Sequence, residues 1–512
     1  MPKVLQLIFL AVVLLSSVTY CQKSSEKKYQ RPNIIYIMSD DHTAQAWGIY
    51  GGILKDYIRN PHIDRLAKQG AVLENVFCTN SICVPSRATV LTGQYSNNNG
   101  VYTLSDALDP DKDNIAKRLQ QAGYQTAIFG KWHLKKQPSG FDTFAVLPGQ
   151  GVYHDPTYLT PDYWNDNEAA GIQQKGFVDD ITTDMSINWM KKTNKNEPFF
   201  LMCHFKSTHE PFDFADRFKN LYEDVAFPYP AGFNDSGASS TGRSFPGQPL
   251  EELGRRYMQA SVGSFWTSYP GLPFSVEGLN KMEARKKIYQ KFIRDYLRCG
   301  AGIDDNIGKI LDYVKAAGIT NNTVIIYTAD QGYFLGEHDF MDKRLMYEQS
   351  LRMPFVICYP KEIKGGTHIK DMVLNIDFAA LFADYAGLKK PDFIQGKSFR
   401  KNLQGHTSKK WRSAMYYRYW QHWPIRPAHY GIRNNRYKLI YFYGNSMGMT
   451  GSSDEATSPA WEFYDLKTDP GEMHNAINKK EYQKAIRKMK KQLLQLKAVA
   501  NDTIGPQPVS IF

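Results

Sequence analysis

The stretch that decides the fold is residues 33–41, which read NIIYIMSDD. Residues 34–38 are apolar or aromatic without interruption, and such a run predicts a strand that is buried on both faces. Asp40 and Asp41 follow where this strand ends. In open α/β sheets, ligands bind beyond the carboxyl ends of the strands. The stretch therefore predicts both a central strand and a functional edge of the sheet.

Similar apolar runs recur along the chain and alternate with helical patterns. Further strands are predicted at residues 125–129, 198–204, 323–328 and 354–358, and helices at residues 61–70, 115–122 and 288–317. Strands that alternate with helices predict an α/β/α sandwich with a large, mostly parallel central sheet. Residues 227–273 break the rhythm, and their Gly, Ser and Pro content predicts an irregular insertion.

The last part of the chain has a different character. Tyrosine and tryptophan crowd residues 416–443, strands are predicted at 437–443 and 461–466, and a helix is predicted at 482–500. This pattern predicts a smaller α+β domain with an antiparallel sheet. We expect a large catalytic domain at residues 22–390 and a small domain at residues 391–512 that contributes substrate contacts.

Acidic and amide side chains follow two of the predicted strands. Asp40 and Asp41 follow the first, and Asp330 and Gln331 follow the strand at 323–328. Adjacent carboxylates repel each other unless a cation offsets them, and Ca²⁺ prefers oxygen ligands from separate chain segments. Helix capping on its own would explain Asp40 and Asp41. Oxygen-bearing pairs at the ends of two strands together indicate a calcium site. No Cys/His zinc site is indicated.

The segment from Cys83 to Gly93 reads CVPSRATVLTG. The residues alone predict a thiol at a helix N-terminus with Arg87 one turn later, an environment that lowers a thiol pKa. A lone cysteine is more often buried and inert. Cys78 and Cys83 could also form a disulfide or bind a metal, and an odd number of cysteines in an exported chain calls for an explanation.

The Cys83 segment resembles the C-x-P-S-R signature of the formylglycine-dependent sulfatases. Residues 33–41, 61–70, 130–133, 208–211, 330–332, 336–347 and 463–475 also resemble blocks of that family in order and spacing. The resemblance covers nearly the whole chain after the N-terminus. It implies an alkaline-phosphatase-like fold with a smaller C-terminal domain, and a sulfatase that is similar to the polysaccharide-directed bacterial enzymes.

The resemblance also implies a role for each site residue. Cys83 becomes formylglycine (3-oxoalanine) through a formylglycine-generating enzyme or another maturase, and its hydrate attacks sulfur. The calcium ligands are Asp40, Asp41, Asp330, Gln331 and the modified Cys83. Arg87 holds the hydrate, and Lys131, His209 and Lys343 bind the sulfate oxygens. His209 also protonates the leaving sugar oxygen, and His133 removes the proton that releases sulfate.

Candidate substrate contacts lie near the start of the small domain. Residues 418–433, RYWQHWPIRPAHYGIR, combine aromatic, His and Arg side chains. Aromatic rings stack on sugars, and Arg binds carboxylate or sulfate groups. His429 and Arg433, together with His338 in the block 336–347, are the candidates. The expected partner is a sulfated carbohydrate, and ulvan, other algal glycans and glycosaminoglycans all fit.

The charge and the N-terminus bear on location and partners. The net charge is +12, which suits either a solvated surface or an anionic substrate, and no nucleic-acid-binding signature accompanies it.

Residues 1–21 have signal-peptide anatomy, so the protein is expected in the periplasm or secreted. Lipidation of Cys21 is an alternative. No later stretch reaches about 18 apolar residues, so no transmembrane segment is expected in the mature chain.

Two other functions stay open. A phosphonate or phosphate ester hydrolase is one, because relatives with the same signature and fold perform that chemistry. An exported glycan-binding protein with unmodified Cys83 is the other. The combination of a nucleophile, an acid and a base argues against a binding protein, and turnover of sulfate and phosphate esters distinguishes the two hydrolases.

Overall fold

The computed structural model describes residues 31–164, 171–235 and 248–505. The chain divides into two units, Met1–Arg31 and Pro32–Phe512, and the fold described below belongs to the second. The expected signal peptide at 1–21, with Cys21, lies outside the described residues. Among the residues that are described, no helix combines the length and apolar character needed to cross a bilayer.

An eight-stranded sheet forms the centre of the molecule, in the order β14-β2-β13-β9-β1-β8-β4-β5. Its strands are β1 (Asn33–Ser39), β2 (Ala71–Leu73), β4 (Gln125–Lys131), β5 (Thr143–Leu147), β8 (Phe199–His204), β9 (Thr323–Ala329), β13 (Phe355–Cys358) and β14 (Thr367–Ile369). Strand β1 pairs in parallel with β8 and β9, and β4 pairs in parallel with β8 and β5. Only β13 runs antiparallel to its neighbours β9 and β2 in this sheet. The predicted mostly parallel sheet is confirmed.

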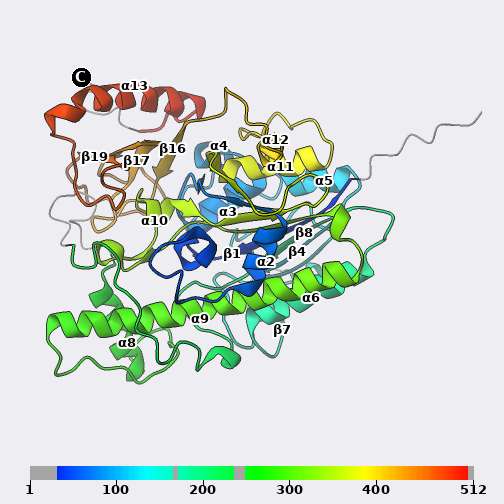
Figure 1. Ribbon diagram of the computed structural model, residues 1–512, viewed down its shortest axis with the longest axis horizontal. Coiled ribbons are helices and arrows are strands. Elements are labelled where there is room, and N and C mark those ends of the chain that lie inside the picture. The colour runs from blue at the N-terminus through cyan, green and yellow to red at the C-terminus, as the bar shows by residue number, and fades with distance from the viewer. Residues whose placement is uncertain (1–30, 165–170, 236–247, 506–512) are drawn as a thin grey trace, which may run out of the picture. The chain divides into compact units, whose positions relative to one another are not determined.

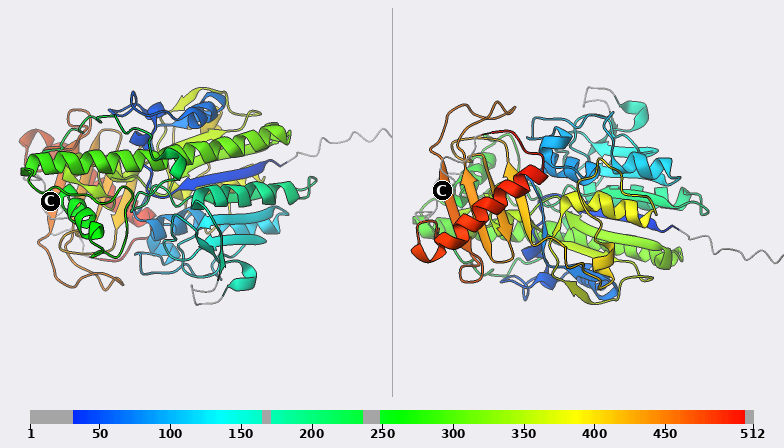
Figure 2. Two further views of the ribbon diagram at one scale, coloured as in Figure 1. Left: turned by 90° about the horizontal axis from the view of Figure 1, so that it is seen from below. Right: turned by 90° about the horizontal axis from the view of Figure 1, so that it is seen from above.

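Helices cover both faces of the sheet (Figures 1 and 2). One layer contains α2 (Pro61–Gln69), α6 (Val178–Lys192) and α9 (Lys281–Ala316), and the other contains α3 (Cys83–Thr92), α5 (Ile115–Gln121) and α11 (Phe378–Tyr385). Alternate residues of β1 enter the two cores: Tyr36 packs with the α3 and α11 layer, and Ile35 with the α2 and α9 layer. This double burial explains why β1 is apolar without alternation.

Two helices differ from expectation. Helix α9 begins at Lys281, earlier than the predicted start near 288, because Asn280 and Glu283 form a capping box. Helix α8 (Leu250–Ser261) lies within the insertion at 227–273, which was expected to be irregular. Its buried face consists of Leu250, Leu253, Gly254 and Tyr257.

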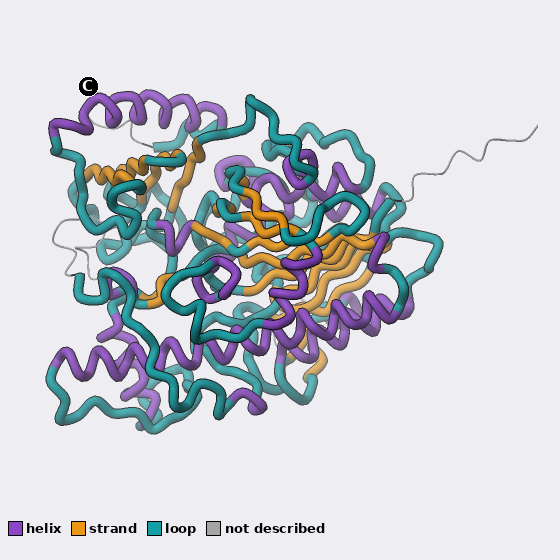
Figure 3. The backbone as a smooth tube through the Cα atoms, viewed as in Figure 1, coloured by secondary structure: helices purple, strands orange, loops and turns teal. Residues whose placement is uncertain are grey.

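The C-terminal part contains a separate four-stranded sheet (Figure 3). Strands β16 (Ala414–Tyr419), β17 (His429–Asn434), β18 (Tyr437–Phe442) and β19 (Ala460–Asp465) are all antiparallel. Helix α13 (Gln483–Val499) packs across it through Ile486, Met489 and Leu493. The smaller antiparallel sheet is therefore confirmed, while the domain boundary at 390 and 391 stays a prediction.

Candidate active site

The site lies at the carboxyl ends of the central strands. Asp40 and Asp41 follow β1, Asp330 follows β9, and Lys131 ends β4. Strand β4 approaches β8 so closely beside Lys131 that a Cβ on Gly130, at φ +93°, would lie 1.9 Å from the His204 carbonyl oxygen. Only glycine fits this position. The sequence thus brings residues from three strands to one edge of the sheet.

Three carboxylates meet at this edge. One oxygen each of Asp40, Asp41 and Asp330 lies within 4.8 Å of the others, and all three residues are at most 1% exposed. Asp41 has a φ of +62°, which is uncommon outside glycine and turns its side chain toward the cluster. Its backbone N–H donates to Asp330 Oδ1 at 3.1 Å. Three buried carboxylates this close require neighbouring cations.

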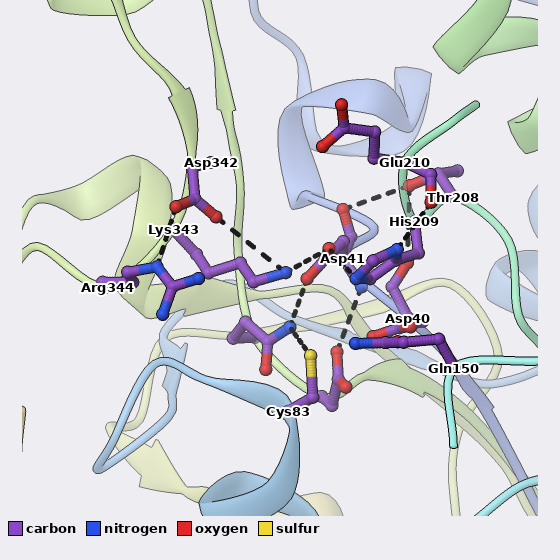
Figure 4. Close-up of polar contacts among 12 residues, drawn as sticks. Asp40, Asp41, Cys83, Gln150, Thr208, His209, Glu210, Asp342, Lys343 and Arg344 are labelled. Atoms are coloured by element: carbon purple, nitrogen blue, oxygen red, sulfur yellow. Dashed lines mark hydrogen bonds and ion pairs between the residues drawn. The ribbon is translucent and has the colours of Figure 1, made fainter. Parts of the chain in front are cut away.

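The chain supplies three cations around the cluster, and Figure 4 shows one of them, Lys343, beside Asp41. Arg87 donates through Nε to Asp330 Oδ2 at 3.0 Å and through Nη1 to the Lys131 carbonyl at 2.8 Å. The ammonium group of Lys131 contacts Asp40 Oδ2, and that of Lys343 contacts Asp41 Oδ2. Each carboxylate therefore has at least one cationic side chain beside it.

This arrangement separates the proton affinities of the carboxylates. Burial raises the pKa of Asp40, but Lys131, His209 and Arg87 outweigh it and hold the pKa well below its usual range. Burial and the neighbouring Asp40 raise the pKa of Asp330 to about 8, although Arg87 opposes the shift. An additional cation bound at the cluster would favour ionisation of Asp330 as well.

Cys83 is the first residue of α3 and faces the same cluster. Its side chain, Asp40 and His209 form another group whose candidate ligand atoms lie within 4.8 Å of one another. The expected lowering of the thiol pKa is wrong: burial, and then the charge of Asp40, raise it. The charge of Lys343 opposes this rise in the pKa but does not offset it. Cys78 and Cys83 are both free thiols, so the possible disulfide between them is also wrong.

Gln331 connects the carboxylates to Cys83. Its Nε2 donates to Asp41 Oδ1 at 2.5 Å and lies 3.8 Å from Cys83 Sγ. Its Oε1 is buried and has no hydrogen-bond partner among the described residues. A buried amide oxygen without a donor is suited to a cation.

His209 approaches from a loop after β8. Its Nε2 lies 3.9 Å from Asp41 Oδ2, and its Nδ1 lies 2.7 Å from the Glu210 carbonyl oxygen. The carbonyl can only accept, so Nδ1 carries a proton and Nε2 faces the site. Burial and the charge of Lys131 lower the pKa of His209 well below its usual value.

His133 lies two residues beyond Lys131, at a φ of +60°. It is 8% exposed, and its Nδ1 has no hydrogen-bond partner among the described residues. Burial and the charge of Lys131 hold its pKa well below the usual range. The ring is thus neutral.

The three candidate substrate contacts lie in other surroundings. His338 is 2% exposed, with Nδ1 3.0 Å from Asp235 Oδ2 and its ring beside Tyr347. His429 is fully buried between Tyr417, Tyr419 and Phe442. Arg433 pairs with Glu348 at 3.0 Å and lies over the Phe77 ring. These contacts fit packing roles, and substrate binding by these residues stays a prediction without support from their geometry.

The structure adds residues that the sequence did not single out. Gln150 Oε1 accepts a 2.5 Å hydrogen bond from Lys131 Nζ, and its carbonyl accepts one from Lys206 Nζ at 3.0 Å. Gln150 follows β5, so the strand-end argument that identified Asp40 could also have identified it. Burial and the charge of Lys131 lower the pKa of Lys206 to about 7.

Comparison with protein families gives two matches. The model for the sulfatase family matches residues 32–388. A second model, for the C-terminal part of N-sulphoglucosamine sulphohydrolase, matches residues 336–499. Together they extend over both the central sheet and the C-terminal sheet.

Individual relatives agree with this assignment. The chain is 38% identical to an N-acetylglucosamine-6-O-sulfatase of Bacteroides thetaiotaomicron, over 94% of this chain and 88% of the relative. It is 24% identical to an ulvan-active sulfatase of Formosa agariphila, over 88% of this chain and 78% of that protein.

A solved structure is similar in fold and sequence. It holds a protein in complex with its substrate D-glucosamine-2-N,6-O-disulfate, and it superposes with a TM-score of 0.82 at 36% identity. The match covers 93% of this chain and 99% of that one. The chain therefore belongs to the formylglycine-dependent sulfatase family and is a sulfuric ester hydrolase.

Proposed function

We propose that the protein hydrolyses 6-O-sulfate esters on glucosamine residues of a sulfated glycan, with a formylglycine made from Cys83 and with Ca²⁺. One observation carries the chemistry. The candidate ligand atoms of Asp40, Cys83 and His209 lie within 4.8 Å of one another, and Asp40 also belongs to the carboxylate cluster with Asp41 and Asp330. The proposed nucleophile, the proposed acid and the proposed cation site therefore lie together at one edge of the sheet.

The donor set fits calcium. Three carboxylates and the Gln331 amide oxygen are hard oxygen ligands from two strand ends, and Gln331 Oε1 has no hydrogen-bond donor among the described residues. Asp40, Asp41, Asp330 and Gln331 would hold the ion. Ca²⁺ bound there would act as a Lewis acid that favours the ionised form of a neighbouring hydroxyl. Formylglycine would supply that hydroxyl by hydration of its aldehyde.

The cationic side chains are placed to bind the sulfate group. Lys131 contacts Oδ2 of Asp40, and Lys343 contacts Oδ2 of Asp41. A divalent ion would compete for these carboxylates, and both ammonium groups could then neutralise the sulfate oxygens. Arg87, which bonds to Asp330, would keep the residue at position 83 oriented.

Two histidines are suited to opposite proton transfers. The Nδ1–H of His209 donates to the Glu210 carbonyl, so Nε2 faces the site and can protonate the leaving sugar oxygen. A bound sulfate ester brings negative charge, which opposes the effect of Lys131 and favours the protonated ring. His133 is neutral and would remove the proton that accompanies sulfate release.

The substrate class rests on the relatives. The more similar relative is an N-acetylglucosamine-6-O-sulfatase at 38% identity, whereas the ulvan-active sulfatase is 24% identical. The solved structure with its glucosamine disulfate substrate also covers nearly the whole chain. These likenesses favour a glucosamine-containing glycan, such as a glycosaminoglycan, over ulvan.

Under this proposed function, the protein would be exported and its Cys83 would be matured. A signal peptide at residues 1–21 would direct the protein to the periplasm or the outside, and a lipid anchor at Cys21 is the alternative. A formylglycine-generating enzyme or another maturase would oxidise Cys83. The catalytic domain would span 22–390, and the domain at 391–512 would border the substrate.

Mass spectrometry of the Cys83 peptide, from protein made in its native host, tests maturation. The mass change from thiol to aldehyde is expected, and an unmodified thiol would favour the alternative of a glycan-binding protein.

Turnover of glucosamine 6-sulfate is then compared with that of glucosamine 6-phosphate and a phosphonate monoester. Faster hydrolysis of the phosphorus esters would reject the sulfatase proposal in favour of its closest rival.

A further inference from the structure

Glu210, the residue after His209, is held by two side chains of the insertion that contains α8. Arg256 Nη1 donates to both Glu210 carboxylate oxygens, at 2.9 and 3.0 Å. The Tyr269 hydroxyl donates to Oε1 of the same carboxylate. Arg256 and Glu210 are 13% and 15% exposed, and Tyr269 is buried. This is a partly buried, charge-assisted contact rather than a solvated surface pair.

Glu210 also determines how the His209 ring is oriented. Its carbonyl oxygen lies 2.7 Å from His209 Nδ1 and accepts the hydrogen bond that fixes the tautomer of the ring. The Tyr153 hydroxyl donates to the His209 carbonyl at 2.5 Å. A shift of the Glu210 side chain would therefore move the acceptor that aims Nε2 at the site.

Arg256 is itself fixed on α8. Its Nε lies 3.2 Å from Glu252 Oε1, one turn earlier on the same helix. Tyr269 packs edge-on against Tyr257 of α8, with ring centroids 4.8 Å apart. The contact with Glu210 thus comes from a packed element and not from a single loose side chain.

We propose that Arg256 and Tyr269 are positioning residues for His209. They hold the Glu210 carboxylate, and through the Glu210 carbonyl they keep His209 Nε2 aimed at the oxygen that leaves with the sugar. This inference rests on the proposed function, in which His209 donates a proton to that oxygen. It gives the insertion a role in catalysis although neither residue contacts the carboxylate cluster.

The role predicts a dependence on the leaving group. A sugar alkoxide needs a proton as the ester bond breaks, whereas a nitrophenolate leaves without one. Misplacing His209 should therefore slow hydrolysis of a sugar sulfate far more than that of 4-nitrophenyl sulfate. A residue that only stabilises the fold would affect both substrates alike.

The experiment measures kcat and KM of the matured, calcium-bound enzyme on glucosamine 6-sulfate and on 4-nitrophenyl sulfate. The variants are Arg256→Gln, Arg256→Lys, Tyr269→Phe and Arg255→Gln. We expect Arg256→Gln and Tyr269→Phe to lower kcat on the sugar sulfate by roughly tenfold or more, with KM and aryl sulfate turnover changed less than about threefold. Arg256→Lys should recover part of the loss.

Arg255→Gln is the matched control, because the neighbouring Arg255 is 48% exposed and pairs with Glu252. It should behave as wild type on both substrates. Equal losses on both substrates, or no loss for Arg256→Gln, would overturn the positioning role. If the wild-type enzyme hydrolyses neither sulfate ester, the proposed function fails instead.

A double-mutant cycle with His209→Ala does not depend on the aryl substrate. If Arg256 acts through His209, then Arg256→Gln should cause no further loss of sugar sulfate turnover in the His209→Ala background. Losses that multiply would show that Arg256 acts elsewhere and would overturn the inference.

Discussion

Arg87 Nη2 lies 2.9 Å from Asp330 Oδ2, and the two side chains are 2% and 0% exposed. This pair joins the helix that begins at Cys83 to the carboxyl end of β9. Breaking a buried pair by removing one partner leaves an uncompensated charge, which typically costs about 3–5 kcal/mol. The pair therefore supports both the fold and the site.

Arg87→Gln should lower the free energy of unfolding by about 3–5 kcal/mol and abolish sulfate ester hydrolysis. Urea unfolding and turnover of glucosamine 6-sulfate measure the two effects. Arg118→Gln is the control, because its pair with Asp113 is 37% and 45% exposed and should contribute less than about 1 kcal/mol. Retention of wild-type stability in Arg87→Gln would contradict this reading of the pair.

Calcium should stabilise the protein through the carboxylate cluster. At a free concentration about 100 times the dissociation constant, a ligand that binds only the folded state adds about 2.7 kcal/mol. We expect chelation to lower Tm and added Ca²⁺ to restore it. Asp41→Asn should lose this response, whereas Asp312→Asn, at a side chain that is 65% exposed, should keep it. An equal calcium response in Asp41→Asn would place the ion elsewhere.

His429 should make stability depend on pH. Burial lowers its pKa from 6.5 to about 4, so the unfolded chain binds the proton more readily between those values. The contribution of neutral His429 to the free energy of unfolding is fully present above pH 6.5. It falls by about 3 kcal/mol as the pH drops from there through the folded-state pKa near 4.

His429→Phe keeps the ring packing and removes the titration. The difference between the wild-type and variant unfolding free energies, measured from pH 4 to pH 8, should change sharply on the acid side. If the unfolding free energies of wild type and variant change with pH in parallel, His429 is not the group that causes the pH dependence. An increased KM for glucosamine 6-sulfate in this variant would instead support substrate binding by His429.

Arg433 should contribute to stability more than to substrate affinity. It pairs with Glu348 at 3.0 Å and is 8% exposed in its side chain. Arg433→Gln should lower the free energy of unfolding by about 3 kcal/mol and change KM less than about twofold. Arg436→Gln is the matched control, because Arg436 is 50% exposed in its pair with Asp465. A large rise in KM without loss of stability would restore the predicted substrate contact.

The sequence predicted those parts of the site that depend on local pattern. Asp40, Asp41, Asp330 and Gln331 could be placed because each directly follows an apolar run, and strand ends in a parallel sheet share one edge. Cys83 and Arg87 lie on the same helix, so their proximity also follows from short spacing. These residues needed no knowledge of tertiary packing.

The sequence could not predict properties that depend on distant partners. The pKa of Cys83 rises because the folded chain buries it beside Asp40, 43 residues earlier, and no local pattern reveals that burial. Arg433 is hydrogen-bonded to Glu348, which is 85 positions away in the sequence, and Arg256 to Glu210, which is 46 positions away. The start of α9 is a different case, because its capping box joins Asn280 and Glu283, which are only three residues apart, and the sequence contains that local pattern.

If Cys83 is oxidised as proposed, its burial also determines when that oxidation can take place. The thiol is 1% exposed, and every residue of α3 is buried. Under the proposed maturation, an oxidising enzyme would have to reach this thiol before α3 packs into the core. If that maturation occurs, a molecule that folds first would keep its thiol, and the active fraction of a preparation would depend on the relative rates of modification and folding.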